Sequence, residues 1–137
     1  MAFGNIVGPH SYRASSDFDK VNAIATIHVA QTAGHQLGCC MVQASLSAAS
    51  TTATLTIYDG ATVAGGITVN GVTTGGTLSG GTVLWKLDVT AAGVTPPFDF
   101  TDDQANSMLA ATLGNSLAAE LTAAGVGIEG SVNMVWY

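Results

Sequence analysis

Apolar and polar residues alternate with a period of two along most of this chain. Successive side chains of a β-strand point to opposite faces, so this period predicts strands that bury one face. Residues 82–90 show it most clearly, and further runs occupy 21–30, 37–44, 54–58, 116–122 and 132–137. Gly-rich segments separate several of the runs. The pattern predicts an all-β fold, an antiparallel β-sandwich or jelly roll.

The run 37–44 is apolar on both faces, which is typical of a central strand covered on both sides. It contains Cys39 and Cys40, which are adjacent in sequence. Neighbouring residues of a strand point in opposite directions, so a disulfide between these two cysteines is not expected. We predict two free, buried thiols, which fit a reducing place of synthesis.

The segment 65–81, GGITVNGVTTGGTLSGG, departs from the long alternating runs. Glycine pairs flank the sequence ITV-NG-VTT, and Asn70-Gly71 suits a type I′ turn. We expect a hairpin arm that projects from the sandwich. A flexible Gly-rich loop is the alternative.

A second departure begins at Thr101, where Thr-Asp-Asp-Gln has the form of a helix capping box. A short helix over 105–113, ended by Gly114, would follow it. The Ala-rich run also accommodates a strand.

Composition limits the classes of function. The 137 residues suit one domain, and we divide them into an extended N-terminal arm, 1–19, and a β-sandwich domain, 20–137. Only 9% of residues are charged, and three Lys and Arg against nine Asp and Glu give a net charge of −6. This balance argues against a nucleic-acid partner, and no apolar run reaches the roughly 18 residues of a membrane-spanning helix. The N-terminus has no basic start followed by an apolar stretch, so no secretory signal is expected.

No motif for catalysis or cofactor binding emerges from the sequence. The histidines His10, His28 and His35 lack metal-ligand spacing, although His28 and His35 could meet across a hairpin. The acidic group Asp99, Asp102 and Asp103 lacks a calcium loop, and helix capping accounts for the last two. No nucleophile elbow, phosphate loop or dinucleotide fingerprint is present. We therefore predict no enzyme activity, no catalytic residue, no metal and no cofactor.

Four segments together resemble a group of small β-sandwich virion proteins of tailed bacteriophages. They are TATLTIYDG, which ends at Gly60, GTVLWKLDV at 81–89, PPFDF at 96–100 and VNMVWY at 132–137. The resemblance implies a structural role, either in capsid decoration (cement) or in small head and tail fibre domains. The chain departs from the group between Asp59 and Gly81, where it is longer, and after Phe100, where it carries the helix-like insert.

From this resemblance we expect a decoration protein on the outside of the capsid, synthesised in the host cytoplasm, that stabilises the assembled shell. Low charge supports the same expectation, because the cores of protein interfaces are depleted in charge. We expect a homotrimer that binds the major capsid protein, without nucleic acid or membrane partners. The predicted capsid contacts are Phe3, Ile6, Val7 and Tyr12. The predicted subunit contacts are Ile67, Val69, Asn70, Gly71 and Val72.

The aromatic residues allow other hypotheses for the function of the chain. Trp85 lies on the apolar face of its run, which predicts core packing. Phe98 and Phe100 are two residues apart, so we expect them to point to one face of a strand. Trp136 and Tyr137 belong either to the last core strand or to an anchor against a neighbouring subunit. In a second hypothesis the chain is a tail-fibre or spike domain, and Trp136, Tyr137 and Tyr58 recognise a host glycan. A small β-sandwich enzyme or metalloprotein is a third.

Overall fold

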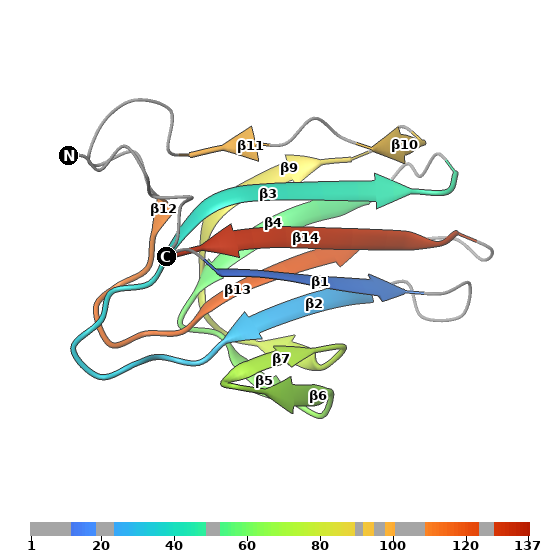
Figure 1. Cartoon of the computed structure of the whole chain (residues 1–137). Helices are drawn as coiled ribbons and strands as arrows, with labels where there is room; N and C mark the ends of the chain where they lie inside the picture. Colours follow the sequence, from blue (N-terminus) through green and yellow to red (C-terminus); the bar gives the residue numbers. More distant parts are fainter. Residues whose placement is uncertain are drawn as a thin grey trace.

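The computed structural model of the chain is all-β and describes residues 12–18, 24–48, 53–89, 92–94, 98–100, 109–123 and 128–137. Two sheets pack face to face as a sandwich, and a small two-stranded ribbon adjoins them (Figure 1). Every strand pair is antiparallel. The predicted antiparallel β-sandwich is therefore confirmed.

Sheet 1 begins with three strands in the order β1–β14–β3. Three short strands, β10, β11 and β12, then pair with the far edge of β3. Their bounds are β1 (Tyr12–Phe18), β14 (Gly130–Trp136), β3 (Gly38–Leu46), β10 (Gly93–Val94), β11 (Phe98–Asp99) and β12 (Leu109–Ala110).

Sheet 2 is six strands wide, in the order β6–β7–β2–β13–β4–β9. Their bounds are β6 (Ile67–Val69), β7 (Val72–Thr74), β2 (Ile24–Val29), β13 (Leu117–Thr122), β4 (Thr54–Asp59) and β9 (Thr82–Asp88). The ribbon consists of β5 (Thr62–Ala64) and β8 (Thr77–Ser79).

The core lies between the sheets and follows the predicted alternation. The core-facing residues of β2, β4, β13 and β14 are almost completely buried, among them Ile27, Leu55, Leu121 and Met134. Strand β3 lies between β14 and the short strands. Both of its cysteines are buried and neither forms a disulfide, as predicted.

Strand β9 departs from the predicted pattern at one position. Ile57 pairs with Trp85 but the next residue, Tyr58, pairs with Val83, so Leu84 is an extra residue in the ladder. An extra residue reverses the alternation beyond it. Val83 is therefore 51% exposed, whereas the alternation in 82–90 predicts that it shares the buried face of Trp85 and Leu87; this prediction is wrong for Val83.

Trp85 closes the side of the core near β9. Its ring centroid lies 5.0 Å from that of Phe98 and 5.4 Å from that of Phe100. All three side chains pack against the buried core. The predicted core packing of Trp85 is confirmed, and so is the shared face of Phe98 and Phe100.

The predicted boundary between arm and sandwich at residue 19 is wrong for residues 12–18. These residues form β1, which pairs with β14 along its whole length, from Tyr12↔Trp136 to Phe18↔Gly130. The strand was hidden because its core-facing positions include Ala14 and Ser16 rather than large apolar residues. Residues 1–11 and 19 lie outside the described residues.

The predicted helix over 105–113 is wrong where the structure describes it. Leu109 and Ala110 form β12 and pair with Cys39 and Gly38 of β3. Pairing with the edge of β3 satisfies the backbone there and overrides the weak helix propensity of the sequence. Residues 101–108, with the predicted capping box, lie outside the described residues.

The predicted hairpin within 65–81 is confirmed, because its two strands, β6 and β7, pair with each other. The alternative of a flexible Gly-rich loop does not describe this segment. Val69 pairs with Val72 across the turn, and Asn70 and Gly71 have φ values of 51° and 79°. Positive φ at both central residues is what a type I′ turn requires. Strand β7 also pairs with β2, so the hairpin extends sheet 2 at its edge.

The outer face of β2 is covered as well. Thr26 Oγ1 donates a hydrogen bond to the carbonyl oxygen of Gly76 at 2.7 Å, and His28 Nε2 donates to that of Ala61 at 2.9 Å. Gly76 and Ala61 directly precede the two strands of the ribbon. These bonds explain why Thr26 and His28, which alternate with the core residues, are themselves buried.

Candidate interaction surface

The two sheets are unequal in width on the side of β1. Sheet 1 ends at β1, which lies against β2, whereas sheet 2 continues beyond β2 with β7 and β6. Figure 1 shows this hairpin beyond the part of the sandwich where β1 and β2 overlap. The hairpin therefore extends past the layer that would cover it.

The core-facing side of sheet 2 continues onto the hairpin. Val29 is a core residue, Val72 pairs with it across the ladder, and Val69 pairs with Val72. Directly paired residues of an antiparallel ladder point to the same face. Ile67 lies two residues before Val69 and shares that face.

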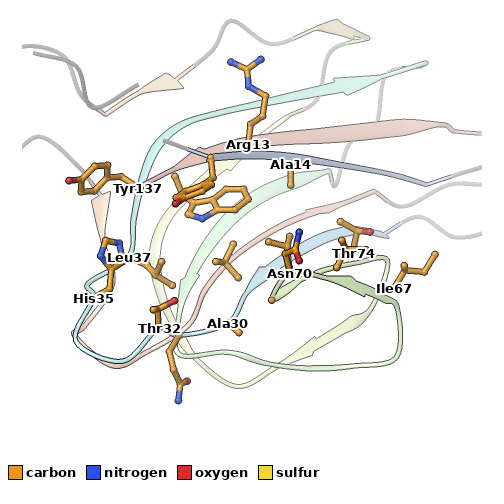
Figure 2. A pocket seen from close by; sticks show the side chains of 17 residues that line it. Arg13, Ala14, Ala30, Thr32, His35, Leu37, Ile67, Asn70, Thr74 and Tyr137 are labelled. Carbon is orange, nitrogen blue, oxygen red and sulfur yellow. The ribbon is translucent and has the colours of Figure 1, made fainter. Parts of the chain in front are cut away.

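A groove of about 910 Å³ lies between β1 and the hairpin (Figure 2). Figure 2 shows Tyr137 and His35 at one end and Asn70, Thr74 and Ile67 at the other. Seventeen residues line it: Tyr12, Arg13, Ala14, Val29, Ala30, Gln31, Thr32, His35, Leu37, Ile67, Val69, Asn70, Gly71, Val72, Thr74, Trp136 and Tyr137.

Large apolar side chains are exposed at this groove. Ile67 is 72% exposed, and Tyr12 and Val69 are 62% exposed each. The ring of Tyr12 stacks on that of Trp136, with centroids 6.1 Å apart and an angle of 26° between their planes. The lining contains one charged side chain, Arg13, which points away from the other labelled groups in Figure 2.

The structure brings together residues that the sequence assigned to two different contacts. Tyr12, the predicted capsid contact, and all five predicted subunit contacts from Ile67 to Val72 line this single groove. The other predicted capsid contacts, Phe3, Ile6 and Val7, lie outside the described residues. The sequence did not assign His35 and Leu37 to a contact surface: Leu37 was expected at the start of the run 37–44, and both residues lie in the loop between β2 and β3.

The three proposed glycan-binding aromatics do not form one site. Trp136 is buried at 5% exposure, and the half-buried Tyr137 lies beside His35, with ring centroids 5.8 Å apart. Tyr58 lies in sheet 2 and directly opposite Ala118 of β13, outside the groove lining.

Tyr58 forms a pair with Glu120 on the outer face of sheet 2. The phenol donates a hydrogen bond to Glu120 Oε1 at 3.3 Å. Burial raises the pKa of Glu120 above its ordinary value, and the bond from Tyr58 opposes this rise. Burial and the nearby carboxylate raise the pKa of Tyr58.

Asp59 links the end of β4 to the turn before β13. Its carboxylate accepts hydrogen bonds from Thr112 N at 3.0 Å, Thr112 Oγ1 at 2.7 Å and Asn115 Nδ2 at 3.0 Å. Desolvation acts to raise the pKa of Asp59, but these hydrogen bonds outweigh it and lower that pKa below its ordinary value. The role of this carboxylate is to hold two loops together.

His28 and His35 have separate surroundings. His28 Nε2 is bonded to the Ala61 carbonyl, whereas His35 lies in the groove beside Tyr137. His28 Nδ1 is buried without a hydrogen-bond partner, next to a second cavity of about 300 Å³. Within the described part of the chain, no three His, Cys, Asp or Glu side chains gather to hold a metal ion.

The acidic residues considered for calcium cannot be assessed together. Asp102 and Asp103 lie outside the described residues, and so does the side chain of Asp99. None of the described segments forms a helix of the length and hydropathy needed to cross a bilayer.

Comparison with protein-family models and with curated proteins finds no match to this chain. The groove is therefore interpreted from its own chemistry.

Proposed function

We propose that this chain is a non-enzymatic structural protein of a tailed-phage virion, of the capsid decoration type. It binds the outside of the shell as a homo-oligomer and makes protein contacts through the groove beside β1. The observation that carries this proposal is the groove itself, with its exposed Tyr12, Ile67 and Val69 and its single charged side chain. The assignment to phage virions rests in addition on the resemblance of the four sequence segments to small virion proteins.

The physical argument starts from exposed apolar surface. Contiguous exposed apolar side chains with a polar rim are typical of protein–protein contact sites. Apart from Arg13, the polar groups at this rim are uncharged, such as Gln31, Thr32 and Asn70, and another protein can cover them without burying an unpaired charge. A protein that binds only the assembled shell stabilises that shell by mass action.

Copy number in purified particles tests the proposal. Quantitative mass spectrometry of particles that carry the chain should find it in amounts comparable to the major capsid protein. Electron cryo-microscopy should place it on the outer surface at regular positions. A few copies per particle, or absence from particles, would contradict a decoration role.

The capsid contact is predicted to involve Phe3, Ile6 and Val7, upstream of β1. Deletion of residues 1–11 leaves β1 and its pairing with β14 in the chain. This variant should keep its circular dichroism spectrum and thermal transition and lose binding to decoration-free capsids. Retained binding would show that the contact lies elsewhere.

A glycan-binding tail-fibre or spike domain is the second candidate. The observation in its favour is that Tyr12, Trp136 and Tyr137 line the groove beside the polar side chains of His35 and Asn70. Aromatic rings with a few polar groups are common in ligand sites. Binding on a glycan array, lost in Tyr12→Ala, together with few copies per particle, would favour this candidate over decoration.

A further inference from the structure

The groove marks a missing part of the sandwich. Sheet 2 carries two strands, β7 and β6, beyond the position where β1 ends sheet 1. A strand that covers the core-facing side of β7 and β6 would have to lie next to β1, in the layer of sheet 1. The outer edge of β1 has no strand partner among the described residues, so that position also offers unpaired backbone groups.

The side chains of the hairpin are those of a covered face. Ile67 and Val69 occupy core-facing positions, as Ile27 and Val29 do in β2. The opposite face carries Thr68, whose hydroxyl group is bonded to that of Thr73 at 2.7 Å. The inward-apolar, outward-polar alternation of the covered strands therefore continues into strands that no described strand of sheet 1 covers.

The two edges of sheet 2 are built differently. The outermost strand on one side, β9, carries Lys86 and Asp88 and has an irregular register, features that oppose pairing with another sheet edge. The outermost strand on the other side, β6, is Ile-Thr-Val and is exposed along its length. It has no charge, proline or bulge, so it remains open to pairing.

Charge opposes a second copy of this chain less at the groove than over the rest of the surface. The chain has a net charge of −6, so two copies repel each other over most of their surfaces. Among the described residues that line the groove there is no Asp or Glu and one cation, Arg13. Contact through this face brings no acidic side chains of the two linings together.

The geometry points to a two-fold joint in which each copy fills the groove of the other. A two-fold axis between the layers, along the strand direction, places the hairpin of the second copy in the layer of sheet 1. Its β6 then lies beside β1 of the first copy, and Ile67 and Val69 of the two copies pack against each other across the layers. The joint is isologous, as most two-fold contacts are, and it closes both grooves at once.

This inference rests on the assembly role proposed for the groove and names its partner as a second copy. It proposes a dimer in place of the homotrimer expected from the sequence. The first test is the mass in solution. Multi-angle light scattering should give twice 13.7 kDa for the wild-type chain. Ile67→Lys and Val69→Lys should be monomers, because each buries two lysines in the joint without a counter-charge.

Leu113→Lys is the matched control. Leu113 is 62% exposed, as Val69 is, but it lies in the turn before β13 and outside the groove. This variant should remain a dimer, and thermal unfolding should show that all three lysine variants are folded. A monomeric or trimeric wild-type protein would overturn the joint, as would a dimeric Val69→Lys variant.

Cross-linking tests the arrangement itself. Ser15 and Thr68 are exposed, and within one copy they lie on the outer faces of different layers. In the joint, Ser15 of one copy and Thr68 of the second copy are neighbours in the same layer. An equal mixture of Ser15→Cys and Thr68→Cys chains should give cross-linked dimers with a short bismaleimide. Each variant alone should not, and no cross-link in the mixture would overturn the arrangement.

These outcomes separate the joint from the proposed function. A monomer or trimer that is found on capsids in high copy number refutes the joint and leaves the decoration role standing. A cross-linked dimer that is absent from particles refutes the decoration role and supports the joint.

Discussion

Replacement of Leu121 by alanine tests the central position of β13. Leu121 is fully buried, and its direct neighbours are Ala25 on β2 and Leu55 on β4. Leu121 is buried because it faces the core and its strand lies between β2 and β4 of sheet 2. The size of the loss therefore reports on the sheet order.

The structure allows the size of the effect to be worked out. Leu→Ala in a core removes transfer free energy and leaves a cavity, at a total of about 2–5 kcal/mol depending on how far the surroundings collapse. Three same-face neighbours of Leu121 are alanines, Ala25, Ala119 and Ala123, whose methyl groups cannot move into the space. We therefore expect a loss in the upper half of that range, about 3–5 kcal/mol.

Urea unfolding followed by circular dichroism measures this loss, and a thermal scan should show a melting temperature lower by about 10–15 °C for a chain of this size. Leu113→Ala is the matched control, since Leu113 is 62% exposed. It should change the free energy of unfolding by less than about 0.5 kcal/mol. If Leu121→Ala loses no more than the control, β13 is not a buried interior strand and the sheet order is wrong.

Three further predictions concern individual groups. Asp59→Asn should reduce the loss of stability in acid. The hydrogen bonds lower the pKa of the Asp59 carboxylate, so its contribution to stability is present above the unfolded-state pKa and is lost as pH falls through the folded-state pKa. Urea unfolding between about pH 6 and about pH 3 measures this loss. Gly66→Ala should lower the melting temperature more than Gly65→Ala; both glycines have positive φ, but a Cβ at Gly66 would lie 2.7 Å from backbone atoms, whereas one at Gly65 meets nothing within 4 Å. The Cys39 thiol should not react with Ellman's reagent at about pH 8 until the protein is unfolded, because burial raises its pKa.

The sequence predicted the strands that are covered by their own chain. In β4, β13 and β14 the buried face is continuous, so a period of two identifies both the strand and its orientation. The Asn70-Gly71 turn was predictable for a different reason, because few turn types accept positive φ at two successive residues.

The features that the sequence did not predict depend on distant partners. Strand β1 forms because it pairs with β14, and β12 forms because it pairs with β3. Neither segment has a strong alternating pattern of its own. The extra residue Leu84 in β9 reverses the face of Val83, and a bulge of this kind leaves no mark in an alternating sequence. The groove likewise joins residues of β1, the hairpin and the chain end, which are far apart in sequence.

The hairpin shows what an alternating pattern can and cannot determine. The pattern in ITV-NG-VTT assigns Ile67 and Val69 to one face and Thr68 to the other, and the structure has this arrangement. It does not determine whether the apolar face is covered by the same chain or by another. Among the described residues the layer that would cover it ends at β1, and Ile67 and Val69 are exposed. Because exposed apolar edge strands are an aggregation hazard unless they are paired or covered, we infer that the sequence of β6 reflects a covering partner.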